Sequence, residues 1–164
     1  MCFHQVCDQS AWKVKHFSGP DCCPNIIYLY TMLNYEPKIL LAFGETFDEN
    51  GEEFFKWLLD NGYPELAALS SCIKGSKEAR DWLMKNKLTH FAAFDGAIDG
   101  KADAIEWLSE HDFHFYIVFA EAIHKKAQAL KWFRDNNLEM FVHLAGKISG
   151  YADRQTFDYH KIHF

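Results

Sequence analysis

The sequence lacks the features that mark membrane-spanning, secreted and nucleic-acid-binding proteins. Its longest apolar runs, such as the one from Phe115 to Ala120, are far too short to cross a bilayer. No basic segment followed by an apolar stretch stands at the start, so we expect no secretory signal. Seventeen Lys and Arg against 23 Asp and Glu give a net charge of −6. This charge argues against a nucleic-acid partner, because phosphate binding requires a basic surface.

Cysteine is scarce and unevenly placed, and the composition excludes a disordered chain. The five cysteines are odd in number and clustered toward one end, which does not suggest a disulfide framework. We therefore expect reduced thiols and a cytoplasmic location. Hydrophobic residues make up 49% of the 164 residues, with 15 Phe, 7 Tyr and 5 Trp. This content suffices for one domain with a sizeable core, unlike the polar composition of disordered proteins.

The most informative feature that is present is a repeat with a period of 25 residues, which extends over residues 57–156. A fixed period of this size is typical of an array of stacked structural units. Four columns of large apolar residues keep the period. They are Trp57, Trp82, Trp107 and Trp132; Leu58, Leu83, Leu108 and Phe133; Leu66, Phe91, Tyr116 and Phe141; and Ile73, Ile98, Ile123 and Ile148.

Each unit is predicted to contain two short helices joined by tight turns. In the first unit Leu66, Leu69 and Ile73 have the three–four spacing of an amphipathic helix. Glycine, which suits a left-handed residue at a helix end, follows this first helix in three units. Asn, Asp or Gly follows the second helix and also tolerates positive φ. The residues that follow the first helices are Gly75, Gly100 and Gly150, with Lys125 in the third unit. The residues that follow the second helices are Asn61-Gly62, Asn86, His111-Asp112 and Asn136-Asn137.

One segment also fits a β-strand. Residues 113–119 alternate in a period of two, as a half-buried strand would. The aligned segments of the other units are rich in alanine and have helical spacing. We therefore predict a helix in this segment as well.

These patterns predict an all-α fold, an α-α solenoid of about five stacked helix pairs in a single domain over residues 1–164. One such pair cannot bury its apolar face alone, and stacking closes a continuous core in which tryptophan and isoleucine fill the space between layers. We predict an irregular N-terminal cap at residues 1–23, a degenerate repeat at 24–56 and four repeats at 57–156. Residues 157–164 are predicted as a C-terminal cap over the open end of the stack.

The second helix and the residues before it resemble the helical half of an ankyrin repeat. The resemblance is carried by Ala97-Ile98-Asp99-Gly100, followed by Ala104 and the apolar pair Trp107-Leu108. Ankyrin units run to about 33 residues and carry a β-hairpin, for which a 25-residue unit has no room. The chain therefore looks like an ankyrin-type helix pair stacked without hairpins. The resemblance implies a protein-binding scaffold with no cofactor.

Two groups of residues offer metal ligands. The segment from Asp95 to Glu106 matches several positions of an EF-hand calcium loop, but Ala97 stands where a third ligand belongs. The repeat accounts for the same residues, so we expect no calcium there. The N-terminal residues could supply soft ligands for zinc, although they lack a Cys-x-x-Cys spacing. We expect no metal in either group. The N-terminal candidates are Cys2, His4, Cys7, Cys22 and Cys23.

The histidines and the N-terminal cysteines leave an enzyme as the rival class. A metal-dependent or hydrolytic enzyme would use these side chains as ligands, bases or nucleophiles. The sequence has no nucleophile elbow, no glycine-rich phosphate loop and no His-Glu-x-x-His pattern. The leading prediction is a non-enzymatic scaffold that binds a protein or peptide.

The expected binding surface is a stripe on the first helices of the units. Recurring residues hold a repeat scaffold together, so a partner should contact positions that differ between units. Helical spacing places such positions on one face, which we expect to be concave. This predicted stripe consists of Thr89, Ala93, His114, Val118, Glu121, Glu139 and His143.

Overall fold

A computed structural model describes residues 32–161, with side chains described for residues 32–155. The all-α prediction is confirmed: after the short 3-10 helix η2 (Met32–Asn34), all regular elements in this part of the chain are α-helices. The segment that also fitted a strand is helical. The helices are α1 (Pro37–Glu45), α2 (Gly51–Asp60), α3 (Pro64–Ile73), α4 (Lys77–Lys85), α5 (Thr89–Ile98), α6 (Ala102–Glu110), α7 (His114–Ile123), α8 (Ala127–Asp135) and α9 (Glu139–Lys161).

The helices form two layers, and this arrangement agrees with stacked helical repeats. The odd-numbered helices contact one another in order, with α3 against α5, α5 against α7 and α7 against α9. The even-numbered helices form a second layer and contact the odd-numbered helices before and after them in the chain. Each unit of 25 residues therefore contributes one helix to each layer, as the period predicts.

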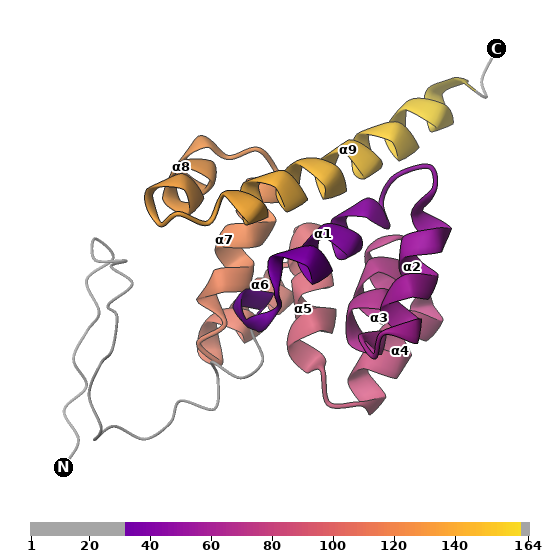
Figure 1. Cartoon of the computed structure of the whole chain (residues 1–164). Coiled ribbons are helices and arrows are strands. Elements are labelled where there is room, and N and C mark those ends of the chain that lie inside the picture. The colour runs from indigo at the N-terminus through magenta and orange to yellow at the C-terminus, as the bar shows by residue number, and fades with distance from the viewer. Residues whose placement is uncertain (1–31, 162–164) are drawn as a thin grey trace.

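The stack closes on itself, which differs from the predicted open end. Helix α1 contacts α3 on one side and, more extensively, α9 on the other. Figure 1 shows α9 lying alongside α1. The odd-numbered helices therefore form a ring, and the last helix covers the first instead of an exposed end.

The last unit also differs from the predicted fifth helix pair. Helix α9 continues for 23 residues through Gly150, which was predicted to end a helix. Gly150 is not among the glycines with positive φ in the described residues. The additional turns of α9 contact the segment after α1, where Tyr151 packs edge-to-face on Phe47 with ring centroids 5.9 Å apart. This packing explains why the helix continues.

The turns follow the predicted period closely. Within the units, Gly75, Gly100 and Lys125 have φ of +94°, +73° and +60°. Between the units, Gly62, Asp112 and Asn137 have positive φ as predicted, whereas in the second unit the left-handed residue is Lys87, one position after Asn86.

A repeated side-chain hydrogen bond marks the ends of three even-numbered helices. The Asn61 side chain donates a hydrogen bond of 2.8 Å to the carbonyl oxygen of Trp57, four residues earlier. Asn86 and Asn136 do the same for Trp82 and Trp132. Each of these carbonyl groups also accepts a hydrogen bond from the backbone N–H of the same asparagine, so the side chain adds a second hydrogen bond at the helix end.

Trp107 and Trp132 pack against the core, whereas Trp57 and Trp82 do not, so the prediction that the tryptophan column fills the space between layers is wrong for the first two units. Trp57 and Trp82 remain 37% and 38% exposed, and Trp107 and Trp132 are half-buried. The next residue in each unit is fully buried, because one step along a helix rotates a side chain by about 100° and only one of the two can face inward. The buried residues are Leu58, Leu83, Leu108 and Phe133.

Candidate functional site

A pocket of about 510 Å³ lies at one end of the helix ring. Helices α3, α5 and α7 end there at Ile73, Ile98 and Ile123, and the middle of α9 adds Ile148. Because the units repeat in register, the isoleucine column places one apolar side chain from each of these helices at the same level. We call this cavity, lined by the four isoleucines, the isoleucine pocket.

The rim of the isoleucine pocket carries charges that are mostly matched within the rim itself. Lys125 forms an ion pair of 2.8 Å with Asp153 of α9. Asp99 forms an ion pair of 2.7 Å with Lys101. His124 Nε2 lies 2.9 Å from the carbonyl oxygen of Ile98, and it must donate because a carbonyl can only accept.

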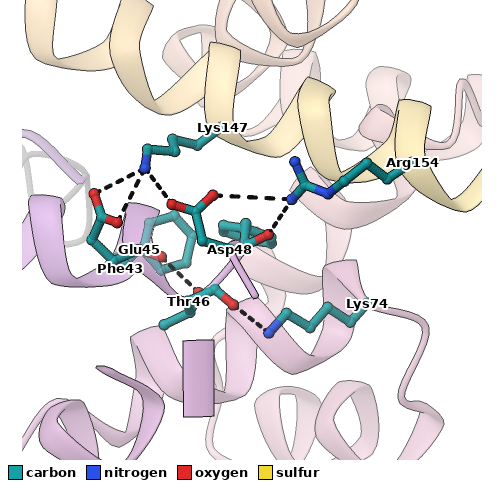
Figure 2. Close-up of polar contacts among 8 residues, drawn as sticks. Phe43, Glu45, Thr46, Asp48, Lys74, Lys147 and Arg154 are labelled. Carbon is teal, nitrogen blue, oxygen red and sulfur yellow. Dashed lines mark hydrogen bonds and ion pairs between the residues drawn. The ribbon is translucent and has the colours of Figure 1, made fainter. Parts of the chain in front are cut away.

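Lys74 has a different environment on the same rim. Its ammonium group donates a hydrogen bond of 2.5 Å to the backbone oxygen of Thr46, as Figure 2 shows. The group also lies 5.6 Å from the ring centroid of Phe47 and 6.0 Å from that of Tyr151, within cation–π range. Burial lowers the pKa of Lys74 below its usual range, and the nearby charge of Glu52 opposes this shift.

The wall that α9 supplies to the pocket is held in place by polar contacts with α1 and the loop after it. Lys147 pairs with Glu45 at 3.0 Å and with Asp48 at 2.5 Å. Arg154 donates a hydrogen bond of 2.6 Å to the backbone oxygen of Phe47. Figure 2 shows both cations of α9 reaching toward the loop that follows α1. The Lys147 ammonium lowers the pKa of Asp48, and this carboxylate raises the pKa of Lys147.

Close packing also brings α1 and α9 together at Gly44. A Cβ atom at this position would lie 2.8 Å from Cδ2 of Leu144. Real Cβ atoms essentially never approach another atom that closely, so the absence of a side chain at Gly44 lets the two helices meet. The closing contact of the ring therefore combines ion pairs with close apolar packing.

The predicted stripe lies on α5, α7 and α9 but does not line the isoleucine pocket. Glu121 pairs with Lys126 at 3.0 Å, and His114 lies 3.8 Å from Asp112. His143 lines a separate, smaller hollow of about 280 Å³ beside Lys147. Two residues of the stripe are exposed and five are half-buried. The exposed ones are Glu139 and His143, and the half-buried ones are Thr89, Ala93, His114, Val118 and Glu121.

Cys72 and Asp95 lie in environments that suppress their reactivity. Cys72 is buried, and burial raises the pKa of its thiol to about 12, so it holds its proton at neutral pH. Asp95, the first residue of the EF-hand-like segment, is buried and pairs with Arg80. Among the described residues, no three His, Cys, Asp or Glu side chains gather to hold a metal ion. The N-terminal cysteines and His4 lie outside the described residues.

His90 makes a testable contribution to pH-dependent stability. It is only 4% exposed and stacks on Phe113, with ring centroids 5.2 Å apart. Burial lowers its pKa to about 4, so the folded protein keeps it neutral where the unfolded chain takes up a proton. Between about pH 6.5 and pH 4, we therefore expect the free energy of unfolding to fall by up to about 3 kcal/mol from this residue. Urea unfolding at several pH values should show a smaller fall in His90→Phe than in wild type.

His143→Gln serves as the control for this experiment, because it removes an exposed histidine. Its unfolding free energy should follow the wild-type dependence on pH. Equal pH dependence in His90→Phe and wild type would show that His90 is not held neutral by the fold.

The isoleucine column that lines the pocket is visible in the sequence, but the 25-residue period alone predicts only packing for it. The isoleucine column stands two positions before the left-handed turn residue in the first three units, at the end of an odd-numbered helix. A column at helix ends can line an opening or pack in the core. Whether the column lines an opening depends on how the ring of helices closes. The 25-residue repeat of the sequence does not show this closure.

Comparisons with known proteins do not assign this site to a family. No helix in the described part of the chain is both long and apolar enough to cross a membrane. A scan against protein-family models, a search of curated proteins and a search of solved structures each found no match to this chain.

Proposed function

We propose that this protein is a non-enzymatic scaffold that binds a partner protein or peptide, and that the isoleucine pocket receives an apolar side chain of the partner. The observation that carries the proposal is the convergence of the isoleucine column on one open cavity, where Ile73 and Ile98 are half-buried and Ile123 and Ile148 belong to the buried core. Its volume of about 510 Å³ lies within the range of roughly 300–1,000 Å³ that is typical of ligand pockets. Such pockets usually have an apolar lining with a few polar groups, and this one combines its isoleucines with a rim that is richer in polar and charged side chains.

The remaining features support a binding module over a catalyst. The Cys72 thiol is protonated and buried, and His90 is neutral and stacked in the aromatic core. The ankyrin-like helix pairs favour a scaffold that works without cofactor or metal. The acidic net charge of −6 favours a protein partner over nucleic acid. We also place the protein in the cytoplasm, away from membranes.

Affinity purification from the host of origin tests the proposal. Ile98→Asn puts a polar side chain on the half-buried wall of the pocket, and it should remove the partner that wild type captures. The matched control is Ile105→Asn on α6, where the isoleucine is 37% exposed and lies away from the pocket. This control should retain the partner. Thermal melts of both variants separate lost binding from lost folding.

A third variant tests the predicted stripe as the competing surface. His114, Glu121 and His143 are changed to alanine together, and each change should alter stability by no more than about 0.5 kcal/mol if the residue lies on the surface. Under the pocket proposal this variant keeps the partner. If the triple variant folds and loses the partner while Ile98→Asn retains it, the stripe is the binding surface and the pocket is not.

A further inference from the structure

The charges around the isoleucine pocket indicate what kind of group it is built to receive. The rim carboxylates of Asp99 and Asp153 each have a lysine within 3 Å. Asp99 also lies 3.9 Å from Arg80. These acidic groups are therefore already neutralised by cations of the protein itself.

Lys74 is the exception on the rim. Among the described residues, no carboxylate lies in ion-pair contact with its ammonium group, which instead contacts the Thr46 carbonyl oxygen and two aromatic rings. One of these rings belongs to Tyr151, which itself lines the pocket. A carbonyl and ring faces compensate an ammonium charge less fully than a carboxylate does. The lowered pKa of Lys74 agrees with this incomplete compensation.

The helix ends at the pocket act in the opposite direction, but each end charge is weak. Helices α3, α5 and α7 end at the mouth, and each adds partial negative charge from its last carbonyl groups. Lys101 and Lys125 follow the ends of α5 and α7 closely in the chain, but they already pair with Asp99 and Asp153. Such end charges contribute only about 0.3–1 kcal/mol at an exposed site and are screened beyond the last turn. Among the described residues, Lys74 is therefore the pocket-lining lysine that has no carboxylate in ion-pair contact, and Glu52 acts on it only from beyond that contact distance.

We propose that the partner segment carries a carboxylate directly beside an aliphatic side chain, with the aliphatic group in the isoleucine pocket and the carboxylate bound by Lys74. This inference rests on the proposed function and specifies the chemistry of the partner. The carboxylate replaces or joins the Thr46 carbonyl as acceptor of the ammonium protons. A hydrogen bond between two charged groups is about twice as strong as one between neutral groups, so it selects among otherwise equal apolar segments.

Titrations with short peptides, followed by nuclear magnetic resonance of the full chain, test the charge preference. The two probes are acetyl-Ala-Leu-Glu-Ala-amide and acetyl-Ala-Leu-Gln-Ala-amide, which differ in one charge. We expect wild type to bind the glutamate peptide about two- to fivefold more tightly, because the Lys74 ammonium is charged in both complexes and only glutamate adds an ion pair with it. Lys74→Gln should remove this preference. Lys131→Gln should keep it, because Lys131 is an exposed residue of α8 that pairs with Asp135.

Two further probes identify the source of the carboxylate and the sign of the preference. Octanoate and octylamine carry the same aliphatic chain with opposite charge. Tighter binding of octanoate than of octylamine, lost in Lys74→Gln, supports the role of Lys74. Binding of octanoate without either peptide would identify a free fatty carboxylate as the ligand and overturn the proposal of a peptide partner.

The remaining outcomes also decide the proposal. Equal affinity for the two peptides, no binding of either, a preference for octylamine, or an unchanged preference in Lys74→Gln each overturns it. Failure of this charge preference is distinct from failure of the proposed function. If Ile98→Asn still loses the host partner while Lys74→Gln shows no change, the pocket binds a partner and only the carboxylate assignment is wrong.

Discussion

Replacing Phe119 with alanine should lower the free energy of unfolding by about 3–5 kcal/mol, the cost of removing a large side chain from a packed core. Phe119 is fully buried on α7. Its ring packs against those of Phe94 and Phe141, with centroids 5.2 and 5.5 Å away. These rings belong to three consecutive odd-numbered helices, so one deletion weakens two helix contacts at once. Urea unfolding measured by circular dichroism gives the change directly.

Trp82→Ala is the informative control for this result. Trp82 is a larger aromatic residue of the repeat, but it is 38% exposed on α4. We expect its removal to cost less than the loss of Phe119, because less apolar surface leaves water when it folds. A greater loss in Trp82→Ala than in Phe119→Ala would mean that the tryptophan column holds the layers together after all.

Replacing Arg80 with methionine should cost about 3–5 kcal/mol at neutral pH, because it leaves the Asp95 carboxylate buried without its ionic partner. Asp95 is 3% exposed on α5, and Arg80 reaches it from α4. The Cys72 thiol also contacts this carboxylate, but it cannot supply a positive charge. Asp95→Asn in the same chain should restore much of the lost stability, because it removes the buried charge.

The dependence on pH gives an independent check of the Arg80 result. Burial raises the pKa of Asp95 above its usual range even with Arg80 present. A raised carboxyl pKa means that the folded protein takes up a proton at a higher pH than the unfolded chain. The deficit of Arg80→Met relative to wild type should therefore shrink as the pH falls toward that pKa.

Lys131→Met is the control, because it breaks the exposed pair between Lys131 and Asp135 and should cost well under about 1 kcal/mol. A loss in Arg80→Met no larger than in this control would show that Asp95 is not buried as a charge.

The helix pairs and turns could be predicted because their causes are local. Leu66, Leu69 and Ile73 have helical spacing within one unit, and the left-handed residues at Gly75 and Gly100 keep the same period. Such features depend on a few neighbouring residues, and each unit repeats the evidence. The all-α fold follows from them.

The parts that could not be predicted depend on distant contacts or on rotation about a helix axis. Trp82 and Leu83 are adjacent apolar residues, and only the packing of α4 decides which of them faces inward. Gly150 stands at a predicted turn, yet it is helical because Tyr151 and Arg154 contact the segment after α1. The isoleucine pocket and the contacts of Lys74 beside it both depend on that same closure of the ring.

Closure of the ring changes how this repeat protein must fold and how it can evolve. An open array lets its end units fray independently, since each touches a single neighbour. Here the contact between Lys147 and Asp48 joins residues 99 positions apart, so the first and last units support each other. The entropy cost of closing so long a loop grows only slowly with its length. Because neither end unit can be lost without removing contacts of the other, we expect a single cooperative unfolding step. Duplication of one unit, which lengthens an open array freely, would here separate α1 from α9.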